Sequence, residues 1–318
     1  MTRPPPLTDL QKRRLGELEP ALRLASKRGD YSEARRLTQA IQGLLRKTGH
    51  ETRLQQAKNW LFEAALEDGR IQTAISGFEG VRKKTNKRTR VYLEATALLA
   101  ISYLRLRDFD SAKPLIAEAH ARVNNINSDR RRRQFQRRLV DRFEVEWTIA
   151  VLADDAPSIL DTDEVYADAG RLVQTTTGDE LLKYMGESLR ADQVDQILRV
   201  YEFSRKQLPS ADRKLLPSPE DKRKRREVGS TLLASAKRVI WRSLCDPESD
   251  VYKMWFTNGL AKVTDYRVIA GAVSASLLSA KLTYLAIAAG ATAMLVKMGV
   301  EVFCESFQPP SMMIGRSE

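Results

Sequence analysis

The chain has 318 residues, of which 53 are Lys or Arg and 41 are Asp or Glu, so its formal net charge is +12. Hydrophobic residues make up 42% of the chain, which is enough for a folded core and excludes a disordered protein. Two cysteines and two histidines are too few for a zinc site or a disulfide framework, which excludes most metalloenzymes and disulfide-rich scaffolds. The N-terminal sequence MTRPPPLTDLQKRR has no apolar stretch after its basic residues. We therefore expect no signal peptide and a reducing, cytoplasmic location.

Three segments in the first half of the chain repeat one pattern. Residues 29–34 (GDYSEA), 69–74 (GRIQTA) and 107–112 (RDFDSA) each follow an amphipathic stretch of helical length and begin another. Their last residues are alanines that lie 40 and 38 positions apart. Each unit is predicted to be helix, tight turn, helix, with Gly or Asp at the turn and the alanine where the second helix packs on the first.

The apolar faces of these units resemble the tetratricopeptide repeat, in which a small residue and an aromatic of one helix pack against Ala and Phe of the next. The third unit matches best, through Leu99, Ala100, Tyr103, Ala112 and Ala119. The repeat proline is absent, the tryptophan position is not filled, and the period exceeds the usual length of about 34 residues. The resemblance covers about residues 9–125, with a degenerate fourth pair over 130–173. It implies a solenoid with a concave groove for a peptide or partner helix, and such arrays are rarely catalytic. An irregular helical bundle is the alternative, and both are all-α.

Basic residues gather in three runs that together hold 17 of the 53 Lys and Arg residues. The runs are Arg82, Lys83, Lys84, Lys87, Arg88 and Arg90, then Arg130, Arg131, Arg132, Arg133, Arg137 and Arg138, then Lys222, Arg223, Lys224, Arg225 and Arg226. In a stack of helix pairs the first two runs fall at equivalent junctions, so we expect both on one edge. Arg46, Lys47 and Arg53 flank the preceding junction and would extend that edge.

A basic edge of this kind can bind the phosphates of RNA or DNA without sequence preference. An acidic protein surface is a second possible partner, and a solvated face with no partner is the third interpretation. Phe135 is the one aromatic residue within these runs. This scarcity argues against binding of single strands by base stacking.

Two loops are expected between the helical regions. The acidic stretch 154–168 contains Asp154, Asp155, Asp161, Asp163, Glu164 and Asp168, but it lacks the glycine and terminal glutamate of a calcium loop, so a helix-capping loop is predicted. Residues 208–219 contain three prolines among polar residues and are predicted to be a linker, followed by a mobile basic run. The predicted domains are a repeat domain over 1–174, a helical connector and linker over 175–228, and an apolar helical domain over 229–318.

The C-terminal region contains an apolar Ala/Gly-rich segment. Residues 268–296 carry one charge, Lys281, which divides them into apolar runs of 13 and 15 residues. Neither run reaches the length of about 20 residues that a membrane span needs. We expect a buried helical hairpin or an oligomer interface, and a segment that inserts conditionally into a membrane is the alternative. If it is buried, self-association or docking on the repeats is implied.

The sequence offers little for catalysis. His50 and His120 are expected to be surface or capping residues, and Cys245 and Cys304 to be unreactive small hydrophobic residues on apolar faces. Neither a phosphate-binding G-x-x-x-x-G-K loop nor a dinucleotide G-x-G-x-x-G motif occurs. No catalytic residue, cofactor or metal site is predicted.

The sequence therefore favours a non-enzymatic adaptor. Its helical repeats would bind a protein partner, its basic edge would contact nucleic acid or an acidic surface, and its C-terminal helical module would support a homo-oligomer or a stable hetero-complex. The alternative is a sensor-effector whose segment 268–296 inserts into a membrane. A hydrolase without familiar motifs is a third possibility.

Overall fold

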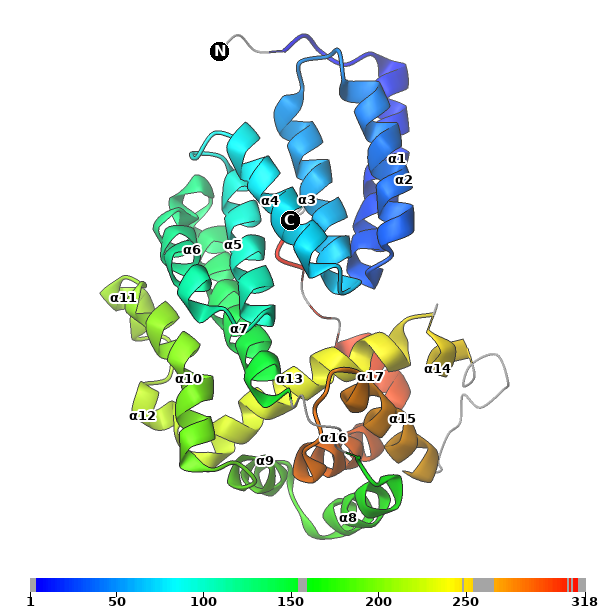
Figure 1. The fold of residues 1–318 in the computed structure, drawn as a ribbon, viewed down its shortest axis with the longest axis vertical. Coiled ribbons are helices and arrows are strands. Elements are labelled where there is room, and N and C mark those ends of the chain that lie inside the picture. Colours follow the sequence, from blue (N-terminus) through cyan, green and yellow to red (C-terminus); the bar gives the residue numbers. More distant parts are fainter. Residues whose placement is uncertain are drawn as a thin grey trace. The chain divides into compact units, whose positions relative to one another are not determined.

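The computed structural model describes residues 4–153, 159–247, 249–253, 266–307, 309 and 311–313 (Figure 1). Within these ranges all regular secondary structure is helical, which confirms the predicted all-α class. Asp154 and Asp155, which the sequence places in the acidic loop, lie outside the described residues. The helices in chain order are α1 (Asp9–Arg28), α2 (Tyr31–Leu45), α3 (Glu51–Glu67), α4 (Ile71–Lys84), α5 (Arg90–Arg105), α6 (Phe109–Ala121), the 3-10 helix η1 (Val123–Asn125), α7 (Asp129–Leu152), α8 (Thr162–Thr175), α9 (Gly178–Glu187), α10 (Ala191–Lys206), α11 (Ser210–Arg213), α12 (Pro219–Lys222), α13 (Arg225–Cys245), α14 (Asp250–Tyr252), α15 (Tyr266–Ser279), α16 (Leu285–Met298) and α17 (Val300–Ser306).

The chain divides into two compact units. Unit 1 contains Met1–Leu139 and Ser311–Glu318, and unit 2 contains Val140–Pro310. The first division therefore lies within α7, whereas the sequence analysis places the main boundary at residues 208–219. Those residues carry α11 and form the start of α12, and they belong to unit 2. The predicted fourth helix pair over 130–173 is divided between the units, because residues 130–139 belong to unit 1 whereas the rest of α7 and α8, which packs against α15 and α16, belong to unit 2.

The three predicted tight turns of unit 1 share one geometry. The residue at the turn has a positive φ in each case, which is the left-handed conformation that closes a Schellman motif. These residues are Gly29 (φ 73°), Gly69 (φ 79°) and Arg107 (φ 60°). The residue after each turn donates its N–H to a carbonyl five residues earlier, from Asp30 to Ala25 at 2.9 Å, from Arg70 to Ala65 at 2.8 Å and from Asp108 to Tyr103 at 3.0 Å. The aligned alanines Ala34, Ala74 and Ala112 are fully buried. These findings confirm the helix, turn, helix prediction.

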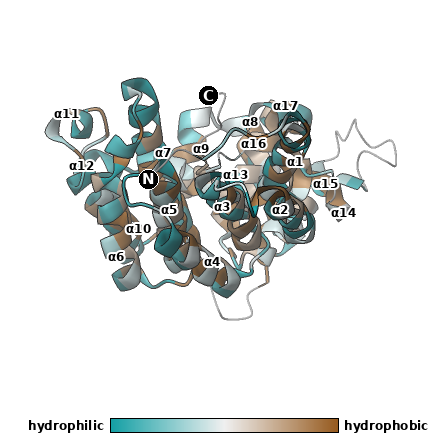
Figure 2. Ribbon diagram, turned by 90° about the horizontal axis from the view of Figure 1, so that it is seen from above, coloured by the Kyte–Doolittle hydropathy of each residue, from teal (hydrophilic) through white to brown (hydrophobic). Residues whose placement is uncertain are grey.

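The helices of unit 1 pack on their neighbours in the chain and on the next helix but one. α1 contacts α2 and α3, α3 contacts α4 and α5, and α5 contacts α6. In Figure 1 these helices lie side by side and alternate in direction. Coloured by hydropathy, the helices carry both hydrophilic and hydrophobic residues, as expected where one face of a helix is buried (Figure 2).

Ion pairs join successive pairs of helices in unit 1. Each connects a helix to the one two positions along the chain. They are Arg53–Glu19 between α3 and α1 (2.5 Å), Arg105–Glu67 between α5 and α3 (3.0 Å) and Arg82–Glu118 between α4 and α6 (2.7 Å). All six side chains are less than a third exposed, so these pairs contribute to packing as well as to charge balance.

Unit 2 is built around α16. Every residue of α16 from Ile287 to Leu295 is buried, and α8, α9, α13 and α15 all pack against this helix. Its small side chains allow the surrounding helices to approach closely. α15 and α16 are joined by a turn in which Lys281 has a φ of 59°. Much of the apolar segment 268–296 thus lies in the core of unit 2, as the buried-hairpin interpretation expects.

α9 and α13 pack closely against each other in unit 2. A Cβ atom added to Gly186 would lie 1.9 Å from the carbonyl oxygen of Arg225, and one added to Gly229 would lie 1.8 Å from that of Leu182. Only glycine fits at these two positions, because the neighbouring atoms belong to the backbone and cannot rotate away.

None of the described helices is long and apolar enough to cross a membrane alone. α16 and α17 together have sufficient length and apolar composition, but they are bent by 95° relative to one another.

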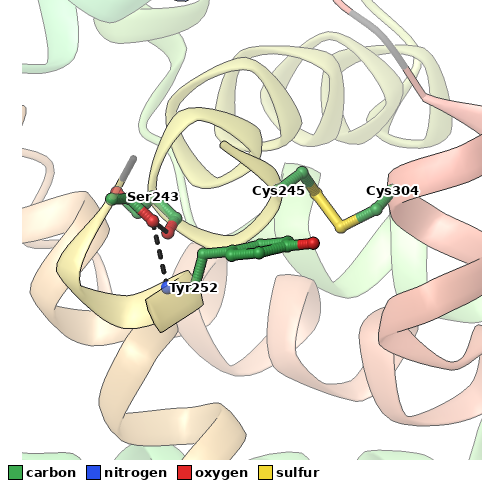
Figure 3. The surroundings of a disulfide bond; sticks show 5 residues. Ser243, Cys245, Tyr252 and Cys304 are labelled. Carbon is green, nitrogen blue, oxygen red and sulfur yellow. Dashed lines mark hydrogen bonds between the residues drawn. A yellow bond between two sulfur atoms is a disulfide. The ribbon is translucent and has the colours of Figure 1, made fainter. Parts of the chain in front are cut away.

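The two cysteines form a disulfide bond, Cys245–Cys304. This bond joins the end of α13 to α17, and the ring of Tyr252 points toward it (Figure 3). The prediction that both residues are unreactive small hydrophobic residues is therefore wrong. Sequence spacing could not reveal the pair, because 59 positions separate the two cysteines.

Candidate functional site

Two helix junctions of unit 1 are held together by hydrogen bonds. The α4–α5 junction contains Lys87 and Thr89, whose carbonyl oxygens each accept a hydrogen bond from Asn125 Nδ2 at 2.9 Å. Arg122 Nη1 donates to the carbonyl of Lys87 as well, at 3.3 Å. The α6–α7 junction, which carries Arg122 and Asn125, is therefore fixed beside the α4–α5 junction. In Figure 1 these junctions and the α2–α3 junction lie at the upper ends of the helices of unit 1.

The two junctions and the first turns of α7 carry most of the cations of the first two basic runs. Nine of the twelve have no carboxylate partner within the described part of the chain. All nine except Arg138 are exposed. We call these nine residues the basic edge: Lys83, Lys84, Lys87, Arg88, Arg130, Arg131, Arg133, Arg137 and Arg138.

The other three cations of these runs have partners in the fold. Arg82 lies between α4, α5 and α6, where it donates to Thr96 Oγ1, Tyr92 Oη and Glu118 Oε2 at 3.1, 3.0 and 2.7 Å. Arg90 pairs with the buried Glu94 and Arg132 with Asp129. Of these three predicted binding residues, Arg82 and Arg90 thus stabilise the helices, and Arg132 forms a surface pair within one helix.

The acid that Arg82 contacts is ionised by its neighbours. Burial alone would raise the pKa of Glu118, but hydrogen bonds from Arg122 and Tyr92 and the charge of Arg82 outweigh burial and lower that pKa. Glu118 therefore neutralises arginines beneath the edge and leaves the exposed cations unbalanced.

Lys84 of the basic edge repels a second lysine, Lys58. The pKa of Lys58, on α3, is lowered first by burial and then by the positive charge of Lys84, while Glu51 acts in the opposite direction. Two neighbouring cations repel each other and create a positive electrostatic potential. A bound anion would lower the electrostatic energy of both. This is the electrostatic property expected of an anion-binding surface.

The third basic run lies in unit 2 and is bound to the fold. Lys222 Nζ is 2.8 Å from the carboxylate of Glu144 and 3.2 Å from Thr231 Oγ1. Arg225 donates to the carbonyl oxygens of Gly186 and Leu189. The remaining three cations pair with carboxylates, Arg223 with Asp195 and Glu202, Lys224 with Asp221, and Arg226 with Asp179 and Glu227. The predicted mobile run is therefore held by contacts within unit 2, and four of its five cations pair with carboxylates there.

The two histidines differ in their surroundings. His50 precedes α3 at a partly exposed position, as predicted. His120 is 4% exposed, and its burial lowers its pKa to about 4. The prediction that His120 is a surface or capping residue is wrong, since it belongs to the buried face of α6.

The acidic stretch contributes a cap, as predicted. The side chain of Asp161 accepts hydrogen bonds from the N–H groups of Asp163 and Glu164 at 2.8 and 3.4 Å, at the start of α8. Throughout the described residues, His, Cys, Asp and Glu side chains form no group of three or more that could hold a metal ion.

Sequence reasoning missed Arg122 and Asn125. Their role is to hold the backbone of the neighbouring junction, and neither belongs to a basic run of the kind that attracts attention in a sequence. Comparison with family models, with curated proteins and with solved structures found no match to the chain. A function therefore has to be inferred from the structure itself, and the inference begins from the basic edge.

Proposed function

We propose that the protein is a non-enzymatic adaptor whose unit 1 binds nucleic acid along the basic edge and a protein partner through its helices. In this proposal α1 to α6 form a tetratricopeptide-like solenoid of three helix pairs. The contacts between each helix and the next two, the three turns of equal geometry and the three buried alanines support that arrangement. A solenoid presents an extended surface suited to binding rather than to catalysis.

The observation that carries the nucleic-acid proposal is the group of nine cations at the end of α4, in the α4–α5 junction and in the first turns of α7, which have no carboxylate partner among the described residues. Lysine and arginine in such an array neutralise phosphates and release counterions, which gives affinity that falls steeply with salt. Phe135, the aromatic residue within the runs, is fully buried and is not available to stack on a base. The proposed mode is therefore contact with the phosphate backbone and little preference for sequence.

In this proposal the buried part of the C-terminal helices does not itself form an oligomer interface. Because residues of α15 and α16 fill the core of unit 2, assembly into an oligomer would use apolar residues that stay exposed on α15, α16 and α17. These are Tyr266, Val268, Leu278, Met298 and Val302. The membrane alternative would require unit 2 to unpack and expose α16.

The test is binding of a fluorescent single-stranded RNA of mixed sequence to the full chain, measured by anisotropy over a range of salt concentrations. The edge variant changes five cations to glutamine, at Lys84, Lys87, Arg88, Arg131 and Arg133. A matched control removes the same charge from exposed cations outside the edge, at Arg13, Lys27, Arg35, Lys206 and Lys214.

We expect the edge variant to bind at least about 10-fold more weakly and to show a shallower dependence on salt, by about 0.7 in slope for each lost phosphate contact. The control variant should bind as the original chain does. Equal losses in both variants would mean that overall charge, and not the edge, attracts RNA. Absence of RNA binding together with edge-dependent binding of a poly-glutamate peptide would replace nucleic acid by an acidic protein.

A further inference from the structure

The C-terminal segment Ser311–Met313 is a part of unit 1, although the chain reaches it from unit 2. Met312 and Met313 are 1% and 5% exposed, so both side chains are buried. The three residues belong to none of the helices, and their polar contacts outside the segment lead to α3 of unit 1.

The polar contact that fixes this segment is the carboxylate of Glu63, on α3. Ser311 Oγ donates to it and lies 2.9 Å from Oε1 and 2.7 Å from Oε2. The N–H of Met312 donates to Oε1 at 3.1 Å. Ser311 Oγ also accepts from the N–H of Met313 at 3.0 Å, which fixes the conformation of the segment.

The position and contacts of Glu63 suit it to recognise a peptide. It is 4% exposed, and Ser26 from α1 donates to Oε2 at 3.3 Å. A buried carboxylate is costly unless donors surround it, and the tail supplies a hydroxyl and a backbone N–H. A carboxylate that accepts from a backbone N–H selects for a peptide, while the adjoining hydroxyl and the two buried methionines select for its sequence.

We propose that the surroundings of Glu63 form a peptide-binding site for a serine followed by two apolar residues, and that the chain's own tail fills this site as a tethered ligand. This inference rests on the proposal that unit 1 binds a protein partner, and it names the segment that such a partner must present. The partner has to displace Ser311–Met313 before it can bind.

The tether sets the strength of that competition. α17 ends at Ser306, and four residues separate it from Ser311. A ligand on a short tether has an effective concentration on the order of millimolar, so a free peptide at micromolar concentration competes poorly with it.

The test measures binding of a fluorescent peptide with the sequence of residues 308–318 (QPPSMMIGRSE) to the full chain by anisotropy. The tail variant carries Met312→Asp and Met313→Asp, which places two charges where apolar side chains are buried and so frees the site. A control chain carries Leu215→Asp, at a position between α11 and α12 that is 59% exposed. We expect the peptide to bind the tail variant at least about 10-fold more tightly than it binds the original chain or the control.

Changes in the peptide test the same contacts without altering the fold. Peptides in which the serine is alanine, or both methionines are aspartate, should bind the tail variant at least about 10-fold more weakly, because they lose the donor to Glu63 or the buried side chains. Glu63→Gln in the tail variant should have a similar effect, with circular dichroism as the check on folding.

Two results would overturn the inference. One is a tail variant that binds the peptide no more tightly than the original chain, and the other is equal binding of the original and altered peptides. RNA binding is measured on the same proteins. Loss of the peptide result with edge-dependent RNA binding intact refutes this inference alone, whereas the reverse refutes the nucleic-acid proposal alone.

Discussion

Unit 1 and unit 2 are both helical, but they are held together by contacts of different range along the chain. In unit 1 the ion pairs between successive helix pairs join residues 34, 36 and 38 positions apart. In unit 2, Lys222 and Glu144 are 78 positions apart, Arg238 and Glu146 are 92 apart, and Lys297 and Thr176 are 121 apart. A contact that recurs at one short spacing leaves a periodic pattern in the sequence, and a contact made once over a long separation does not.

The small residues show the same difference. Ala34, Ala74 and Ala112 perform one packing role in three successive turns of unit 1. Gly186 and Gly229 perform theirs once, at the crossing of α9 and α13, where backbone meets backbone. Unit 1 therefore distributes its packing over equivalent contacts, while unit 2 depends on single contacts. Loss of one such contact should affect unit 2 more than unit 1.

The largest effect is expected from Gly229→Ala. The new Cβ would lie 1.8 Å from the carbonyl oxygen of Leu182, so α9 and α13 must separate and the core around α16 must open. We expect unit 2 to lose more than about 4 kcal/mol of unfolding free energy, as severe backbone clashes do. Hydrogen exchange followed by mass spectrometry measures this loss separately in peptides of each unit.

Gly170→Ala is the matched control within unit 2. Gly170 lies inside α8 and a Cβ there meets nothing within 4 Å, so alanine should stabilise the helix by about 0.5–1 kcal/mol. If Gly229→Ala leaves the exchange of α9 and α13 unchanged, the two helices do not pack as closely as described, and the contrast between the units is lost.

The next effect concerns the disulfide Cys245–Cys304. It closes a loop of 59 positions, for which the chain-entropy estimate of stabilisation is about 4 kcal/mol. We expect reduction, or the double change Cys245→Ser and Cys304→Ser, to lower the urea midpoint of unit 2. Peptides of unit 1 should keep their exchange rates, since both cysteines lie in unit 2. An equal loss in both units would show that they unfold as one.

The helix, turn, helix units of unit 1 could be predicted because their determinants are local. Gly29 and Gly69 indicate turns, and the alanines five positions later indicate where the next helix packs on the preceding one. Arg107 occupies the position equivalent to the two glycines in the third segment, and it adopts the same left-handed conformation. The start of unit 2 was not predicted, because α7 passes through the boundary as one continuous helix without a break in its sequence pattern.

The candidate site was predicted in part, for a related reason. A run of cations is visible in a sequence, but whether each cation is available depends on acids elsewhere in the fold. Arg82 meets Glu118, 36 positions away, and Lys222 meets Glu144, 78 positions away. The contact of Glu63 with Ser311 spans 248 positions and has no sequence signal. Charge runs therefore predict the location of a surface, and the structure decides which of its residues can bind.

The smallest effect tests the repeated turn itself, by alanine substitution of two glycines in unit 1. Gly69 has a φ of 79° at the turn before α4, whereas Gly80 lies within α4, and a Cβ at either position meets nothing within 4 Å. The two substitutions therefore differ in backbone conformation and not in packing. Gly69→Ala should lower the unfolding free energy of unit 1 by about 1 kcal/mol, because a side chain is strained in the left-handed region. Gly80→Ala should raise it by about 0.5–1 kcal/mol. Urea unfolding followed by circular dichroism, with exchange in the peptides of α3 and α4, measures both. Effects of the same sign would mean that the turn at Gly69 does not adopt the conformation on which the repeat depends.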